Sequence, residues 1–117
     1  MTYPEIRDIH SPDLEPPTLP DDPAECAVRF RTVVGPRGGP EAEAFSFTVI
    51  TPARLARSAE PVWGRGLLVI PVFDWALVIQ AVALLLARCV RPTWDEVAAE
   101  LNRELRWEVA TGGSAEG

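Results

Sequence analysis

The sequence lacks most of the residue types from which active sites are built. Its 117 residues contain one histidine, His10, and two cysteines, Cys26 and Cys89. A single histidine excludes the paired-histidine motif of zinc proteases, and no Cys-x-x-Cys, Gly-x-Ser-x-Gly or phosphate-binding loop occurs. His10 adjoins a proline-rich segment, where we expect it to be solvated. We therefore predict no catalytic residues, no bound metal and no cofactor.

Lysine is absent, and no cluster of basic residues replaces it. Eleven arginines face seventeen acidic residues, which gives a net charge of −6. Residues 1–25 carry seven acids and one arginine, whereas residues 26–117 carry ten of each. Nucleic-acid affinity requires a clustered basic face, so direct binding through Arg29 and Arg31 is disfavoured. The acidic excess favours a basic partner, or serves solubility.

No hydrophobic run is long enough to cross a membrane. The candidate, residues 67–87, is interrupted by Pro71 and Asp74, and the uncharged stretch that follows is shorter than the roughly 20 residues required. The first ten residues lack the basic and apolar regions of a secretion signal. We expect a cytoplasmic protein whose two thiols are buried or free, because a reducing compartment disfavours disulfides.

The length predicts one domain over residues 1–110. Within it, residues 11–23 contain five prolines and four acids. The prolines remove the backbone donors that a sheet requires, so we expect an extended connector there, called the acidic connector below. Residues 111–117 are expected to form a flexible tail.

Two stretches of alternating hydrophobicity, residues 26–34 and 43–51, flank the turn sequence GPRGGP. This pattern predicts an antiparallel hairpin with a long loop. Further strands are expected at residues 3–10, at residues 67–72 as a central strand, and at residues 107–110.

Two main helices are expected to follow the central strand. Asp74 is placed to cap a helix that runs to Arg88, and Thr93 with Glu96 forms a capping box for a second. Because the first is apolar nearly all round, it should be covered on more than one side. The prediction is an α+β fold, an antiparallel sheet of four to five strands packed on one face by two main helices. The expected core comprises Val28, Phe30, Phe45, Phe47, Val49, Leu68, Val69, Leu77, Val78, Leu84, Val97 and Leu101.

Two features outside this core could bind a partner. Glu96, Glu100 and Glu104 recur every four residues on the second helix and are either a solvated stripe or a face for a basic partner. Trp63 lies in a glycine-flanked loop, either as an exposed interface anchor or folded over the core. The other three tryptophans are expected to make core or helix–sheet contacts.

Several segments also occur in the order and spacing of a known family. They are EIRDIHSPDLE, the acidic connector, CAVRFRTVVGPRGGPEAEAFSFTVITPARL, WGRGLLVIPVFDWALVI, TWDEVAAEL and RWEV. Over about residues 5–109 the chain resembles the immunity protein 8 family of bacterial polymorphic toxin systems. Residues 45–55 and 93–108 carry the resemblance most strongly. The chain differs from the usual pattern in having no lysine and a proline-rich start.

The resemblance implies an α+β protein that is not an enzyme and that binds a toxin domain encoded beside it. Such a protein neutralises the toxin by stoichiometric occlusion, and a basic nuclease is one candidate partner. A structural or adaptor subunit with an acidic solubilising segment is the alternative, and homo-oligomerisation stays open. The candidate toxin-binding residues are Asp13, Glu15, Asp21, Asp22, Trp63, Glu96, Glu100 and Glu104.

Overall fold

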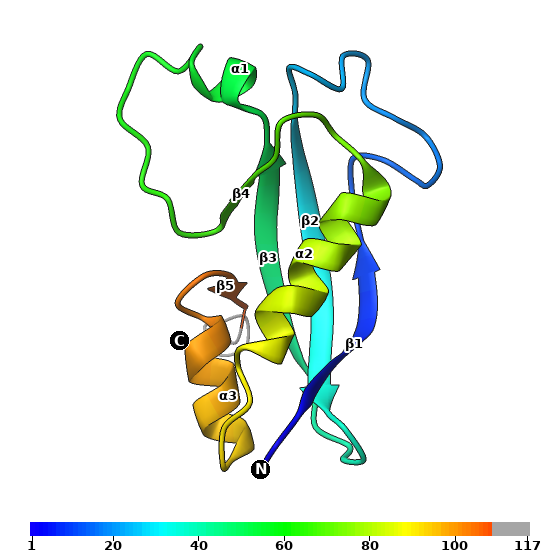
Figure 1. Cartoon of the computed structure of the whole chain (residues 1–117), viewed down its shortest axis with the longest axis vertical. Coiled ribbons are helices and arrows are strands. Elements are labelled where there is room, and N and C mark those ends of the chain that lie inside the picture. Colours follow the sequence, from blue (N-terminus) through cyan, green and yellow to red (C-terminus); the bar gives the residue numbers. More distant parts are fainter. Residues whose placement is uncertain (109–117) are drawn as a thin grey trace.

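A long hairpin forms the centre of the computed structural model, which describes residues 1–108 (Figure 1). Strand β2 (Ala27–Pro36) pairs with β3 (Glu43–Ile50) in antiparallel register, so that Phe30 lies beside Phe47. The two alternating stretches and their turn are therefore correctly predicted. Strand β1 (Pro4–His10) pairs antiparallel with the other edge of β2.

Two short strands extend the sheet beyond β3, which gives five strands in the described part of the chain. Strand β4 (Leu67–Val69) runs parallel to the end of β3, and β5 (Arg106–Trp107) pairs antiparallel with its start. The fold is α+β as predicted, but the sheet is mixed. Residues 51–66 return the chain to the side of Thr48, so β4 runs in the direction of β3.

The strand expected at residues 67–72 is shorter than predicted and lies at an edge of the sheet. Pro71 has no N–H to donate to a neighbour, and the chain turns there toward its next helix cap. One face of β4 is consequently open, and Val69 is 51% exposed rather than in the core.

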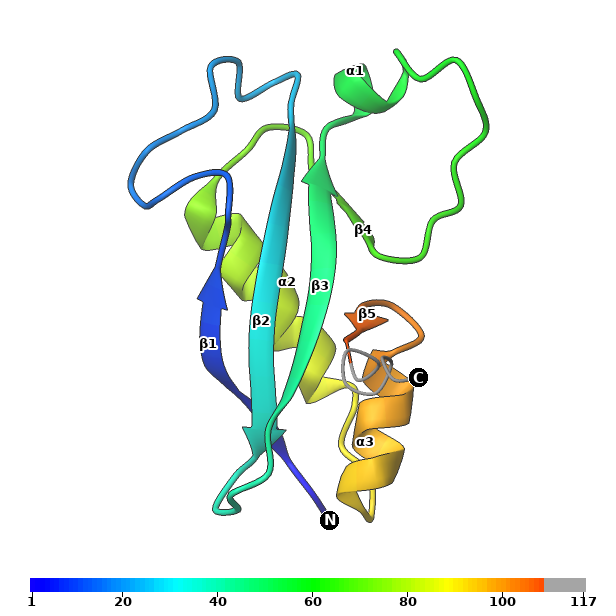
Figure 2. The same cartoon turned by 180° about the vertical axis from the view of Figure 1, so that it is seen from behind.

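Within residues 1–108, three helices accompany the sheet: α1 (Pro52–Leu55), α2 (Trp75–Ala87) and α3 (Trp94–Leu101). Asp74 and Thr93 are the N-cap residues of α2 and α3, as predicted. Only the Thr93 half of the predicted capping box is found within residues 1–108. The carboxylate of Asp74 accepts hydrogen bonds from the N–H groups of Ala76 and Leu77, and the hydroxyl of Thr93 accepts one from Glu96. Helix α2 crosses one face of the sheet diagonally, while α3 lies beside β5 (Figures 1 and 2).

The core lies between this face of the sheet and the helices. Phe30 and Phe47 stack with ring centroids 5.3 Å apart, and Phe73 and Trp75 pack against Phe30. Helix α2 contributes one narrow buried stripe and α3 a second. Buried residues from these elements include Val28, Val34, Phe45, Val49, Val78, Val82, Leu86, Cys89, Val97, Ala98 and Leu101.

The expectation that α2 is covered on more than one side is wrong. Leu77 and Leu84, both predicted in the core, are 40% and 62% exposed. Both positions lie on the side of α2 opposite its buried stripe, which recurs every four residues. In Figure 1 no element lies over that side of the helix. Leu68 is half-buried.

The predicted thiol environment is confirmed: Cys26 and Cys89 are buried and free, and burial raises the pKa of both. Within residues 1–108 no helix has the length and hydrophobicity needed to cross a membrane. The end of the strand expected at residues 107–110, and the tail expected at residues 111–117, lie outside the described residues.

Candidate functional site

The acidic connector is fastened to the sheet through its first acid. Asp13 receives hydrogen bonds from the Arg29 side chain at 2.7 Å and from the Arg29 backbone N–H at 2.9 Å. The side-chain bonds and then the backbone bond hold the pKa of Asp13 below its ordinary value. This carboxylate is thus used inside the chain, and its engagement fixes where the connector starts.

Further bonds hold the rest of the connector. The Trp75 indole N–H donates to the Thr18 carbonyl at 2.8 Å, which ties the middle of the connector to the start of α2. One oxygen of Asp22 accepts from the Ala24 N–H at 3.0 Å. Glu15 and Asp21 are exposed, so these two acids and the outer oxygen of Asp22 are the charges that the connector presents to solvent.

The glutamate stripe is shorter than the sequence suggests. Helix α3 ends at Leu101, and Asn102 caps it, so Glu104 lies in the turn that follows. The chain turns there because the Asn102 side chain accepts a hydrogen bond from the Trp107 N–H as β5 begins. Glu100 is placed between Arg91 at 3.3 Å and Arg103 at 3.9 Å, which leaves Glu96 and Glu104 as the less engaged acids.

Trp63 is exposed over 90% of its surface, which decides between its two predicted placements. The loop behind it is held firmly: Arg65 donates to the backbone carbonyl and the side-chain oxygen of Asn102 at 2.9 and 2.6 Å. The Gly66 N–H donates to the Glu104 carbonyl at 2.8 Å. An anchored loop with an exposed indole at its tip has the form of an interface anchor.

Trp75, Trp94 and Trp107, by contrast, are partly buried against the core as predicted.

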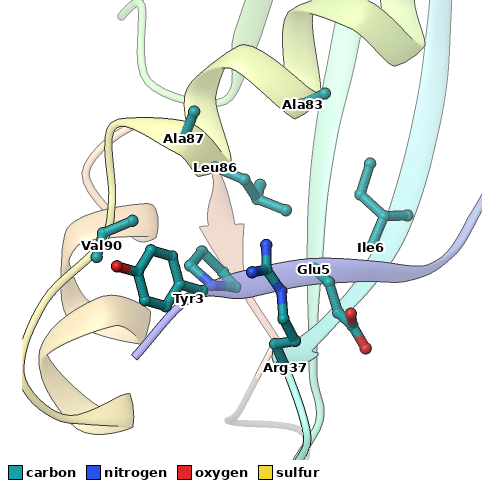
Figure 3. A pocket seen from close by; sticks show the side chains of 9 residues that line it. Tyr3, Glu5, Ile6, Arg37, Ala83, Leu86, Ala87 and Val90 are labelled. Atoms are coloured by element: carbon teal, nitrogen blue, oxygen red, sulfur yellow. The ribbon is translucent and has the colours of Figure 1, made fainter. Parts of the chain in front are cut away.

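The structure contains a groove that was not predicted from the sequence. It lies between β1 and α2, has a volume of about 390 Å³, and is lined mainly by apolar side chains (Figure 3). The Arg37 guanidinium lies 5.1 Å from the centre of the Tyr3 ring at its rim. No local pattern could have indicated this groove, because its walls come from residues 3–6, residue 37 and residues 83–90.

The predicted binding residues do not form one site. The acidic connector lies near one end of the long axis and α3 near the other, in both views (Figures 1 and 2). The Trp63 loop extends from the β4 edge, across the sheet from the connector. Between these separate regions, the Gly66 N–H donates to the Glu104 carbonyl, which places Glu104 beside the end of the Trp63 loop.

The remaining polar groups provide little chemistry. Arg29 and Arg31, the two arginines of a nucleic-acid hypothesis, are paired with Asp13 and Glu108. His10 is exposed, as predicted, and its Nδ1 lies 2.8 Å from Asp8. No group of three potential metal ligands is found among residues 1–108.

Comparison with known proteins gives one match. The family model described as immunity protein 8 matches residues 5–111, nearly the whole chain. No curated protein and no solved structure matches it.

Proposed function

The chain belongs to the immunity protein 8 family, and we propose that it neutralises a cognate toxin domain by stoichiometric occlusion. Membership makes a toxin the expected partner and a binding role, rather than catalysis, the expected activity. The family match is the observation that carries this proposal. The sequence offers few side chains suited to catalysis, which agrees with this proposal.

Trp63 is the first candidate for the toxin contact. Large aromatic side chains dominate interface energies when a partner covers them, and this indole is 90% exposed. Its loop is held at Arg65 and Gly66, so little conformational entropy is lost on docking. Glu104 lies at the base of the same loop and supplies a carboxylate for a basic toxin.

The free acids of the connector and Glu96 are assigned a different role. Glu15, Asp21, Asp22 and Glu96 are exposed and lie on regions remote from the Trp63 loop. We assign to them the long-range attraction that speeds association with a basic partner. Asp13 positions the connector through Arg29, and Glu100 is engaged by Arg91 and Arg103.

Coexpression with the neighbouring gene product tests the function. A toxin domain encoded beside this chain should arrest growth alone and should be silenced by the chain, and the purified pair should titrate at one to one. Trp63→Ala should weaken binding about thirtyfold, the loss typical of a central aromatic anchor. Val62→Ala, on the same loop and 51% exposed, is the matched control. If no neighbouring gene product binds and growth arrest persists, the result would favour the alternative function, a structural or adaptor subunit.

The electrostatic part is tested separately by association rates. Glu15→Gln, Asp21→Asn and Asp22→Asn combined should slow association and flatten its dependence on ionic strength. Folding should be nearly unchanged, since exposed charges of this kind contribute under about 0.5 kcal/mol. Equal rates and equal salt slopes for wild type and variant would assign the connector to solubility alone.

A further inference from the structure

The outer side of α2 is an apolar surface that nothing in the described structure covers. Helix α2 contains no charged residue between Trp75 and Ala87. On its outer side Leu77 and Leu84 are 40% and 62% exposed. In Figure 1 this side of the helix faces away from the sheet, with no element over it. Exposed large apolar side chains on one side of a helix are a common feature of interaction surfaces.

The spacing on this outer side is that of a helix–helix seam. Leu77, Gln80, Leu84 and Ala87 follow one another at intervals of three, four and three residues, which is the pattern of positions a and d in a heptad. Ala76 and Ala83 lie beside the seam and are exposed. Small side chains at these positions allow another helix to approach closely.

The two ends of the helix carry opposite charges. Asp74 caps the N-terminal end and Arg88 the C-terminal end. Both are exposed, and within residues 1–108 neither forms an ion pair. A helix that lay antiparallel on α2 would be matched best if it carried an arginine opposite Asp74 and an acid opposite Arg88.

We propose that the occupant of this surface is a second copy of the chain, with the two α2 helices antiparallel across a two-fold axis at Gln80 and Ala81. This register places Leu77 of each copy against Leu84 of the other, and Asp74 within one residue of Arg88. The sequence of α2 is thus complementary to itself, as a two-fold interface requires. The antiparallel helix dipoles also attract each other.

The uncharged seam also explains why this surface can join two acidic molecules. Each copy carries a net charge of −6, so contact through the connector or α3 would set acid against acid. The same register directs Val72, 48% exposed, toward the groove of Figure 3 in the second copy, where Val90 forms one wall. This contact adds area to a seam about 20 Å long.

Sedimentation velocity over a range of concentrations tests the proposal. The wild-type chain should approach twice its 12.8 kDa mass as concentration rises. Leu84→Glu places a charge against the apolar seam in each copy and should raise the dimer dissociation constant about a hundredfold. Leu19→Glu introduces the same charge at a leucine of the connector that is 51% exposed, and it should leave the dimer intact.

Cross-linking supplies a second readout that does not depend on that variant. Gln80→Cys, at the proposed axis, should form a disulfide-linked dimer rapidly under mild oxidation. Ala99→Cys, at an exposed position of α3, should not.

A wild-type chain that stays monomeric, or equal dimerisation by the two glutamate variants, overturns the proposal. Equal cross-linking at positions 80 and 99 does the same. If instead Leu84→Glu abolishes binding to the toxin while the wild-type chain alone is monomeric, the surface belongs to the toxin and the second copy is wrong.

Discussion

The acidic connector and helix α2 are the two segments whose composition departs most from the rest of the chain. The connector holds four of the seventeen acids in thirteen residues, and α2 holds none of the charge. From the sequence, the connector's charges were expected to be free and the apolar side chains of α2 to be covered. Both expectations are partly wrong: some of the connector's acids are bonded inside the chain, and some apolar side chains of α2 are exposed.

The connector uses some of its polar groups for bonds inside the chain. Asp13 accepts hydrogen bonds from Arg29, and Asp22 accepts one from the Ala24 N–H. The Thr18 carbonyl accepts a hydrogen bond from the Trp75 indole N–H. Helix α2 uses only one stripe of its apolar surface. Charged side chains can therefore pair with neighbours in the same chain. Apolar side chains on the outer side of a short helix stay exposed until another molecule covers them.

The largest expected effect separates the two sides of α2. Leu86 is 4% exposed and Leu84, two residues earlier, is 62% exposed. Leu86→Ala should lower the free energy of unfolding by about 3 kcal/mol through lost burial and a cavity, and Leu84→Ala by less than about 0.5 kcal/mol. Urea denaturation followed by tryptophan fluorescence at low protein concentration measures both. Similar losses for the two variants would mean that the outer side is covered within a single chain.

An intermediate effect is expected where the two segments meet. Trp75 packs on Phe30 and Phe73 and bonds to the Thr18 carbonyl. Trp75→Phe removes that bond and some contact area, and should cost about 1 to 2 kcal/mol. It should also speed cleavage of the Asp21–Asp22 bond in the connector by a protease that cuts on the amino side of aspartate.

Trp94→Phe is the control for this effect. Trp94 is also partly buried at the first residue of a helix, yet no bond joins it to the connector. If both variants are cleaved equally fast, the indole bond does not hold the connector.

The sequence was sufficient wherever a local pattern determines the structure. Alternation predicted β2 and β3, and Asp74 and Thr93 predicted the starts of α2 and α3. Amphipathic α3 buries Val97 and Leu101 as expected. A helix that is apolar on every side has no such preferred face, and for that reason Leu77 and Leu84 were wrongly placed in the core.

Features that depend on distant partners could not be predicted. The parallel pairing of β4 follows from the path of residues 51–66, and the groove beside Tyr3 from three separate segments. The end of α3 at Leu101 depends on the bonds of Asn102 with Arg65 and Trp107. The Arg65 bonds also fix the end of the loop that carries the exposed Trp63.

The smallest expected effect concerns the bond that ties the connector to the sheet. The pKa of Asp13 is lower in the folded chain than in the unfolded one, chiefly because Arg29 donates to its carboxylate. Stability from this group is therefore fully present above the unfolded pKa of about 3.9 and is lost as the pH falls through the folded value. Asp13→Asn should cost less than about 1 kcal/mol at neutral pH, the usual limit for a pair open to solvent.

The cost of Asp13→Asn should vanish in acid, because the wild-type carboxylate is then protonated. Melting temperatures of wild type and variant, measured from neutral pH downward, should begin to converge below the unfolded pKa and meet below the folded one. Glu15→Gln is the matched control: Glu15 is an exposed acid of the same connector that forms no ion pair within residues 1–108, and its variant should follow the wild-type curve throughout. A difference between wild type and Asp13→Asn that persists at low pH would show that the Arg29 bond is not its source. The connector would then be held by Trp75 and by its own prolines rather than by charge.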